Sequence, residues 1–225
     1  MGLSDKKNSI SIIIPVYNEK DNAPGIVKRV KDLQIDKEII VVDDGSEDGS
    51  YEILKEIDGI ILTRHEKNRG KGAAVRTGID LACGEYTIVQ DADLEYPVEL
   101  IPLFYYNRED CDAIYGSRIK GRGDFILLSY LANRILSLLT SILYKRYISD
   151  METCYKMVRT DMLKSLNLKA NRFDIEPEIT AKLLRKGLKI REIPITYAGR
   201  KRGKKIGPID GVMAIITLLR YRFWR

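Results

Sequence analysis

The chain has 225 residues, of which 44% are hydrophobic and 31% are charged, so it can form a folded domain with a sizeable core. Its three cysteines, Cys83, Cys111 and Cys154, are odd in number and far apart, which argues against a disulfide framework or a zinc site and indicates a reducing compartment. The formal net charge is +6, and residues 200–225 carry eight Lys or Arg against one Asp. Such a tail suits nucleic acid, anionic lipid or a phosphorylated substrate.

Short runs rich in Ile and Val alternate with helical patterns in the first half of the chain. Helical patterns lie at 22–34 and 50–57, and the runs that predict strands lie at 10–16, 38–43, 59–64, 85–90 and 112–117. This alternation predicts an α/β fold with a mainly parallel sheet flanked by helices. Ligands bind beyond the carboxyl ends of such strands, and polar clusters follow the first, second and fourth runs.

The second half contains two long apolar stretches. Residues 125–144 carry a single charge and are long enough to span a membrane, but polar residues recur every three or four positions, at Ser129, Asn133, Ser137, Ser141 and Tyr144. We therefore expect an amphipathic helix on a bilayer or against another subunit, with an ordinary core helix as the alternative. Residues 211–225 mix apolar residues with arginines, Tyr221 and Trp224, which suits a lipid headgroup region.

Asp91 and Asp93 follow the fourth predicted strand, with Glu95 close behind. Carboxylates so close together raise one another's pKa, so the cluster predicts a cation among them. An Asp-x-Asp pair can hold Mg²⁺ or Mn²⁺ that is shared with substrate phosphates. A solvated acidic loop is the alternative.

Two further segments contain residue types that suit a nucleotide site. Asp43 ends the second predicted strand, where a carboxylate could accept hydrogen bonds from a base or a ribose, although a turn followed by a helix cap explains the same residues. In the segment 65–78, Lys71 and Arg76 could face phosphate at a helix start, but the glycine spacing fits neither a Walker loop nor a dinucleotide fingerprint. We expect a structural role for His65, the only histidine.

Taken in order, six motifs resemble the inverting family-two glycosyltransferases, which have the GT-A fold of nucleotide-diphospho-sugar transferases. The motifs are SIIIPVYNE (11–19), VVDDGSEDGS (41–50), NRGKGAAVRTG (68–78), DADLEYP (91–97), GSR (116–118) and RKRGKKI (200–206). More narrowly, they resemble the branch that makes dolichyl- or polyprenyl-phosphate sugars. The resemblance covers about residues 9–222. It implies one continuous domain with a nucleotide-sugar-binding half, 1–118, and an acceptor-binding half, 119–225, that carries membrane-facing amphipathic helices.

The resemblance also implies roles for individual residues. The donor would be held by Pro15, Tyr17, Glu19, Asp43, Lys71, Asp91 and Ala92. A Mg²⁺ or Mn²⁺ ion would be bound by Asp91, Asp93 and Glu95. Donor or acceptor phosphates would meet Arg118, Arg200, Arg202, Lys204 and Lys205. The residues expected to be catalytic are Asp93 and Asp150, where Asp150 or Glu176 would orient the acceptor or serve as a base.

The expected reaction moves one hexose from UDP-glucose or GDP-mannose to a polyprenyl or dolichyl phosphate, with inversion and with a divalent metal. The segment GKGAAVRTG (70–78) resembles the glucosyl branch slightly more, and the absence of a QxxRW signature disfavours a processive synthase. One alternative is a soluble or glycan acceptor, with the apolar helices forming a homodimer interface. Another is a nucleic-acid- or membrane-binding protein that uses the basic tail, although no nucleic-acid motif is present. The charged start and the basic end predict a peripheral position on the cytoplasmic face of the membrane.

Overall fold

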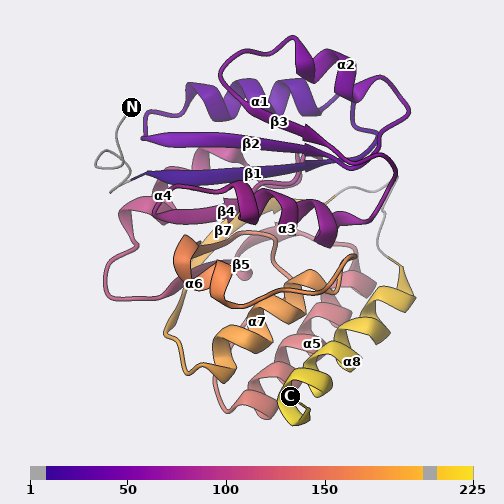
Figure 1. Cartoon of the computed structure of the whole chain (residues 1–225). Coiled ribbons are helices and arrows are strands. Elements are labelled where there is room, and N and C mark those ends of the chain that lie inside the picture. Colours follow the sequence, from indigo (N-terminus) through magenta and orange to yellow (C-terminus); the bar gives the residue numbers. More distant parts are fainter. Residues whose placement is uncertain (1–8, 200–206, 225) are drawn as a thin grey trace.

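The computed structural model describes residues 9–199 and 207–224 (Figure 1). Its strands are β1 (Ile10–Val16), β2 (Lys37–Asp43), β3 (Ile61–Arg64), β4 (Tyr86–Val89), β5 (Ala113–Asp124), β6 (Lys156–Arg159) and β7 (Ile190–Ala198). They form a seven-stranded sheet in the order β3-β2-β1-β4-β6-β5-β7. Among the described strands, β6 alone runs antiparallel to its neighbours, so the expected mainly parallel α/β sheet is confirmed.

The described helices flank this sheet and extend beyond it. They are α1 (Ala23–Asp32), α2 (Ser50–Lys55), α3 (Lys71–Leu81), η1 (Val98–Leu100), α4 (Ile101–Tyr106), α5 (Leu127–Tyr144), α6 (Thr160–Ser165), α7 (Ile175–Arg185) and α8 (Pro208–Phe223). Helix α3 packs closely on β1, since a Cβ at Gly78 would come 2.4 Å from the Ile13 side chain. Helices α5, α7 and α8 pack together below the sheet in the view of Figure 1.

The sheet forms where the sequence is almost continuously apolar. The Ile and Val side chains of β1 and of the second half of β2 are buried, as expected for central strands of a parallel sheet. Four predicted strands agree with the structure within two residues, whereas β5 continues to Asp124 because its second half pairs with β7. The strands β6 and β7 were not predicted. Both come from the second half of the chain and join the same sheet, and the expected division at residue 118 falls inside β5.

The polar stripe predicted on the 125–144 segment is the face by which α5 docks onto the protein. Asn133 Nδ2 donates to Asp150 Oδ1 at 2.8 Å, and Ser137 Oγ accepts from the Met151 backbone N–H at 2.9 Å. Further along, the Tyr144 hydroxyl donates to the Leu218 carbonyl of α8 at 2.9 Å. The apolar face therefore points away from the protein, and Leu128 and Ile135 are 75% and 63% exposed. The alternative of an ordinary core helix does not hold.

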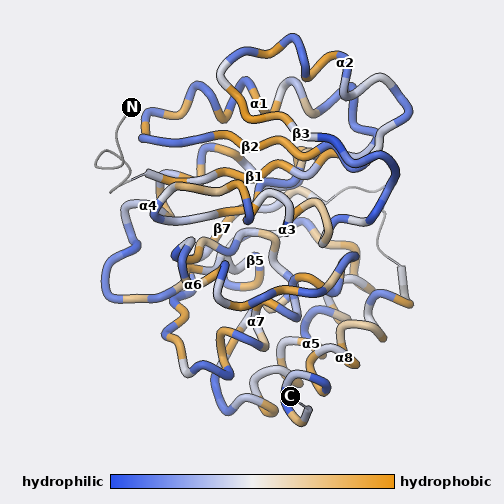
Figure 2. The backbone as a smooth tube through the Cα atoms, in the orientation of Figure 1, coloured by the Kyte–Doolittle hydropathy of each residue, from blue (hydrophilic) through white to orange (hydrophobic). Residues whose placement is uncertain are grey.

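Helix α8 also exposes apolar side chains, including Ile209, Val212 and Ile216, and Figure 2 shows hydrophobic positions along both helices. A small core lies beneath α5, α7 and α8 and contains Leu136, Ile148, Met151, Ala181, Leu184, Ala214 and Leu218. In the part of the chain that the structure describes, α5 is the one helix whose length and composition would allow it to cross a membrane.

Candidate active site

The loops after β1 and β2 are joined at the carboxyl edge of the sheet. The Asp44 backbone N–H donates to the Val16 carbonyl at 2.8 Å, and the Asn18 N–H donates to Ser46 Oγ at 2.9 Å. The Glu19 N–H donates to Ser50 Oγ at 3.1 Å. Figure 2 shows hydrophilic loops at this edge. The structure thus brings together four of the residues expected to hold the donor, namely Pro15, Tyr17, Glu19 and Asp43.

Asp43 is fully buried at the end of β2 and has one unused oxygen. Its Oδ2 accepts from the Ser46 N–H at 3.2 Å and lies 3.1 Å from Arg64 Nε. Its Oδ1 has no hydrogen-bond partner among the described residues. A buried acceptor without a partner costs free energy, so Asp43 Oδ1 fits a hydrogen-bond donor that arrives with a ligand.

Asp44 and His65 hold the next loop in place. Asp44 accepts hydrogen bonds from the backbone N–H groups of Arg69 at 2.9 Å and Gly70 at 2.7 Å. His65 Nδ1 lies 2.6 Å from Asp44 Oδ1, and its Nε2 lies 2.9 Å from Thr77 Oγ1. Both ring nitrogens are therefore occupied, and the structural role predicted for His65 is confirmed.

Gly70 sits where the chain cannot accept a side chain. Its φ is +97°, and a Cβ there would lie 2.4 Å from the Asn171 carbonyl oxygen. We expect Gly70→Ala to lower the free energy of unfolding by about 3 kcal/mol, measured by urea denaturation, because strain and a backbone clash add together. Gly49 provides the matched control: its φ is +90°, but nothing lies within 4 Å of its Cβ position, so Gly49→Ala should cost about 1 kcal/mol. Equal losses in the two variants would show that the contact with Asn171 is unimportant.

Lys71 and Asp91 form an ion pair at the start of α3. Lys71 Nζ lies 2.7 Å from Asp91 Oδ1 and 3.0 Å from Oδ2, and Glu176 Oε1 lies 3.7 Å away. Burial alone would lower the pKa of Lys71, but Asp91 and Glu176 outweigh burial and raise it well above its ordinary value. Lys71 is therefore a permanent positive charge beside the first aspartate of the pair.

The three carboxylates expected to bind metal have different surroundings. Both oxygens of Asp91 contact Lys71, and Glu95 Oε2 accepts from the Tyr197 hydroxyl at 2.7 Å. Asp93 Oδ1 accepts from the Glu95 N–H at 3.3 Å, while Ala92 between the two aspartates is buried. Within residues 9–199 and 207–224, no three His, Cys, Asp or Glu side chains form a metal-holding group. The hard oxygens of this segment fit a divalent ion when substrate oxygens and water complete its shell, and the three-carboxylate site stays a prediction.

Arg118 and Asp150 form a buried bidentate pair, which bears on the roles expected for both. Asp150 is fully buried and accepts from Arg118 Nε at 2.8 Å, Arg118 Nη2 at 2.7 Å and the Arg118 backbone N–H at 2.8 Å. Asn133 donates to it as well. Burial would raise the pKa of Asp150, but Arg118 and these hydrogen bonds hold it below its ordinary value. A buried, fully paired carboxylate with a low pKa makes a poor base, so this geometry disfavours the catalytic role predicted for Asp150.

The Arg118 guanidinium, which was expected to bind phosphate, donates hydrogen bonds to Asp150 instead. The Arg118 guanidinium also lies among three rings, 5.1 Å from the centroid of Tyr197, 5.5 Å from Phe125 and 5.9 Å from Tyr96. Arg118 is thus anchored on several sides, and phosphate binding by it stays a prediction. The other expected phosphate ligands, Arg200, Arg202, Lys204 and Lys205, lie outside the described residues.

Lys156 is a member of the site that sequence reasoning missed. It is buried, and its Nζ lies 2.5 Å from Glu176 Oε2. Glu176 therefore pairs with Lys156 and Lys71, and the structure brings the two halves of the chain together at this point. The signal in the sequence was a lysine at the start of the short apolar run KMVR (156–159), which is unusual for a buried strand.

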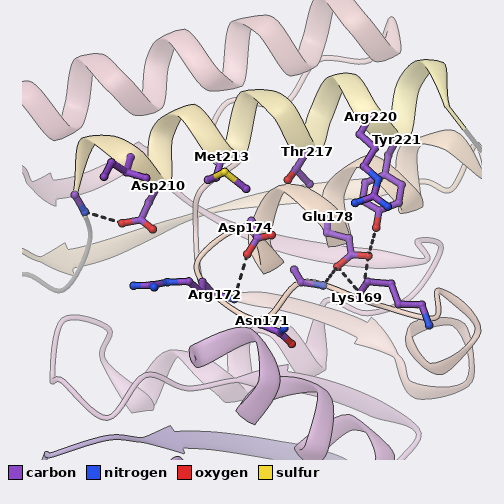
Figure 3. Close-up of a pocket in the computed structure, with 13 residues that line it drawn as sticks. Lys169, Asn171, Arg172, Asp174, Glu178, Asp210, Met213, Thr217, Arg220 and Tyr221 are labelled. Atoms are coloured by element: carbon purple, nitrogen blue, oxygen red, sulfur yellow. Dashed lines mark hydrogen bonds between the residues drawn. The ribbon is translucent and has the colours of Figure 1, made fainter. Parts of the chain in front are cut away.

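A separate cavity of about 590 Å³ opens between α8 and the segment that precedes α7 (Figure 3). Apolar residues of α8, such as Met213, face Asn171 and Arg172 across it. The Asn171 carbonyl accepts from the Ala73 backbone N–H at 3.0 Å, so the segment that lines this cavity also contacts the first turn of α3.

Comparison with known proteins assigns the chain to a family. The family model described as Glycosyl transferase family 2 matches residues 11–166. The chain belongs to glycosyl transferase family 2. The match includes β1, β2 and β4 with the loops at their carboxyl ends. The family resemblance expected from the six motifs is confirmed.

Two curated relatives of this family-2 chain are undecaprenyl-phosphate 4-deoxy-4-formamido-L-arabinose transferases. The one from Proteus mirabilis is 36% identical over 55% of this chain and 41% of its own length, and the one from Pseudomonas fluorescens is 29% identical over 93% and 64%. The chain thus spans less than two thirds of the length of either relative. An uncharacterized protein of Methanocaldococcus jannaschii is 30% identical over 84% of this chain and 81% of its own length.

Solved structures show the same fold. Glucosyl-3-phosphoglycerate synthase from Mycobacterium tuberculosis, in complex with Mn²⁺, UDP-glucose and phosphoglyceric acid, has a TM-score of 0.77 at 19% identity, covering 100% of this chain and 85% of that one. The same enzyme with Mg²⁺ and UDP has a TM-score of 0.74 at 18% identity, with the same coverage of both chains. The expected GT-A fold of this family-2 chain is confirmed.

Proposed function

We propose that the protein is an inverting glycosyltransferase that moves one hexose from a nucleotide sugar to a polyprenyl phosphate. The observation that carries the proposal is the shared carboxyl edge of β1, β2 and β4, where Asp43 has an unused buried acceptor and Lys71 pairs with Asp91. Membership of family 2 and the activity named for the Proteus and Pseudomonas relatives support a sugar donor and a lipid-phosphate acceptor.

Each residue at this edge would bind a different part of the donor. Asp43 Oδ1 would accept a hydrogen bond from the base or the ribose, and Tyr17 lies beyond the end of β1 beside it. The Lys71 ammonium would stabilise negative charge on the departing diphosphate, which is where charge builds up in glycosyl transfer. A Mg²⁺ or Mn²⁺ ion bound by Asp93, Asp91 and diphosphate oxygens would supply Lewis-acid stabilisation of the same charge.

The acceptor phosphate needs little help from the protein to react. Its oxygen is already ionised near neutral pH, so attack on the anomeric carbon requires orientation more than a strong base. This agrees with the surroundings of Asp150, whose carboxylate already accepts hydrogen bonds from Arg118 and Asn133. In this mechanism Asp150 positions Arg118 and α5 instead of removing a proton.

The exposed apolar face of α5 and α8 suits a peripheral contact with the cytoplasmic face of a membrane. The polar side of α5 is docked onto the protein through Asn133 and Ser137, so the helix lies along the surface with Leu128 and Ile135 outward. The C-terminal ends of both helices lie together, since Tyr144 contacts Leu218. These ends carry exposed cationic and aromatic residues, namely Lys145, Arg146, Tyr147, Arg220, Arg222, Phe223 and Trp224. Cations and rings beside an apolar face fit anionic headgroups.

A glutamate on this face should prevent vesicle binding. We expect Leu128→Glu and Ile135→Glu each to reduce binding to phosphatidylglycerol vesicles by about tenfold or more, because each variant loses apolar burial and adds a repelled charge. Sedimentation with vesicles measures the effect. Ile53→Glu is the matched control, since Ile53 is 44% exposed and its helix, α2, lies far from α5 and α8 in Figure 1. Loss of binding in the control alone, or unchanged binding in all three variants, would contradict the membrane contact.

The test of the donor site is a thermal-shift panel of UDP, GDP and CDP with their common sugar conjugates, each with and without Mn²⁺. A ligand at 100 times its Kd stabilises the native state by about 2.7 kcal/mol, so a bound nucleotide raises Tm measurably. We expect one base to bind, and to bind more tightly with Mn²⁺. Sugar transfer to undecaprenyl phosphate and to a soluble phosphate then identifies the acceptor. A panel with no stabilising nucleotide would refute the proposed donor site.

A further inference from the structure

Glu152 is a partly buried acid that the proposed mechanism does not use. It lies in the segment between α5 and β6, and its backbone N–H donates to Asn133 Oδ1 at 3.4 Å. Its neighbours Met151 and Thr153 are fully buried. Glu152 Oε1 is also buried, and it has no hydrogen-bond partner among the described residues. Native structures rarely leave such an oxygen unpaired unless a ligand or water meets it.

Among the described residues, four charged groups act on Glu152, and each of them is already paired with another group. The cations are Lys156 of β6 and Arg118 of β5, and the acids are Glu176 of α7 and Asp150 of the same segment. Lys156 lies 2.5 Å from Glu176, and Arg118 lies 2.7 Å from Asp150. An ionised Glu152 would therefore be an excess buried negative charge.

The neutral form of Glu152 is favoured below about pH 7. Burial has the largest effect and raises the pKa of Glu152 to about 7, with Glu176 and Asp150 adding to the shift and the two cations opposing it. A neutral carboxyl group can both donate and accept a hydrogen bond, as a sugar hydroxyl can. It also adds no charge that would repel a diphosphate.

Both ion pairs act on Glu152, and they belong to different parts of the site. On one side, the Lys156–Glu176 pair leads to Lys71 and Asp91, which meet the diphosphate in the proposed mechanism. On the other side, the Arg118–Asp150 pair contacts Asn133 of α5. In the proposed mechanism the sugar passes from donor to acceptor, and it would lie in this region during transfer.

We infer that Glu152 recognises the transferred sugar. Its side-chain carboxyl group, whose Oε1 is otherwise unpaired, would form a hydrogen bond with one hydroxyl group of the sugar. This inference rests on the proposed function. It assigns to Glu152 a role in donor-sugar specificity, separate from nucleotide and metal binding.

The test compares a nucleotide with its sugar conjugate in three proteins: wild type, Glu152→Gln and Glu152→Ala. The probes are UDP with UDP-glucose and GDP with GDP-mannose, measured by isothermal titration with Mn²⁺ at pH 6.5. We expect the nucleotide alone to bind equally to all three proteins. The conjugate should bind about tenfold more weakly to Glu152→Ala, the size of one hydrogen bond, and nearly normally to Glu152→Gln, which keeps a donor and an acceptor.

A second measurement tests the buried neutral acid without any ligand. Because the folded-state pKa is raised above the unfolded value, wild type loses stability as pH rises from about 4.5 through about 7, and glutamine does not. The Tm of Glu152→Gln should therefore exceed that of wild type at pH 8 and match it at pH 5.

The outcomes separate the two proposals. If neither UDP nor GDP binds to wild type, the proposed donor site fails and this inference fails with it. Two results would overturn only the assignment of Glu152 to the sugar. In the first, a nucleotide binds, but its sugar conjugate has the same affinity for wild type and Glu152→Ala. In the second, Glu152→Ala also lowers the affinity for the nucleotide alone. A Tm difference that does not depend on pH would overturn its neutral state.

Discussion

Replacing Asp150 by alanine should lower the free energy of unfolding by about 3–5 kcal/mol, because it leaves the Arg118 guanidinium buried without its partner. Arg118 is 9% exposed, and Asp150 accepts three of its hydrogen bonds. Urea denaturation measures the loss. Glu99→Ala is the matched control: the Arg29–Glu99 pair has the same 2.7 Å separation but exposed side chains, so its loss should be below about 1 kcal/mol.

The contribution of Asp150 to the free energy of unfolding should depend on pH in a definite direction. The pKa of Asp150 is lowered in the folded state, so its contribution is complete above the ordinary value of 3.8 and is lost as pH falls through the lowered value. The double variant Arg118→Met with Asp150→Leu should recover much of the stability, since apolar replacements remove the unpaired charge. If Asp150→Ala instead keeps wild-type stability but loses turnover, Asp150 is a catalytic base after all.

Replacing Asp93 by alanine should reduce sugar transfer by about 10³-fold while leaving the fold intact. Asp93 is partly exposed, so its loss should change the free energy of unfolding by only about 0.5 kcal/mol. The effect on transfer is large because stabilisation of the departing diphosphate is the main electrostatic contribution to the reaction. Turnover with the donor identified by thermal shift, and the gain in nucleotide Tm caused by Mn²⁺, both measure the change.

Asp91→Ala should have an additional consequence, since it removes the partner that lies 2.7 Å from Lys71. We expect a similar loss of transfer together with a lower Tm. Asp36→Ala is the control, because Asp36 is exposed and precedes β2 at the opposite edge of the sheet. Normal transfer and an unchanged Mn²⁺ effect in Asp93→Ala would exclude the proposed metal role.

The sequence by itself determined the first half of the fold and the position of the polar carboxyl edge of the sheet. Strands β1, β2 and β4 are buried along most of their length, so they appear as nearly continuous apolar runs that local reading detects. The polar clusters at their ends must meet at one edge of a parallel sheet, which placed Asp43 and Asp91 correctly relative to each other. The stripe on α5 was also visible, because its period is a property of the helix alone.

Only the tertiary structure decided what the second half contributes. Strands β6 and β7 are defined by pairing with β4 and β5, which lie far away in sequence, and β6 is just four residues long. The partners of Asp150 and Glu176 were equally hidden, since an ion pair depends on which cation reaches the carboxylate in space. Glu152 is the clearest example of what a sequence cannot show. Its raised pKa follows from burial beside charged groups that are already paired with one another, and no local sequence pattern encodes those pairings.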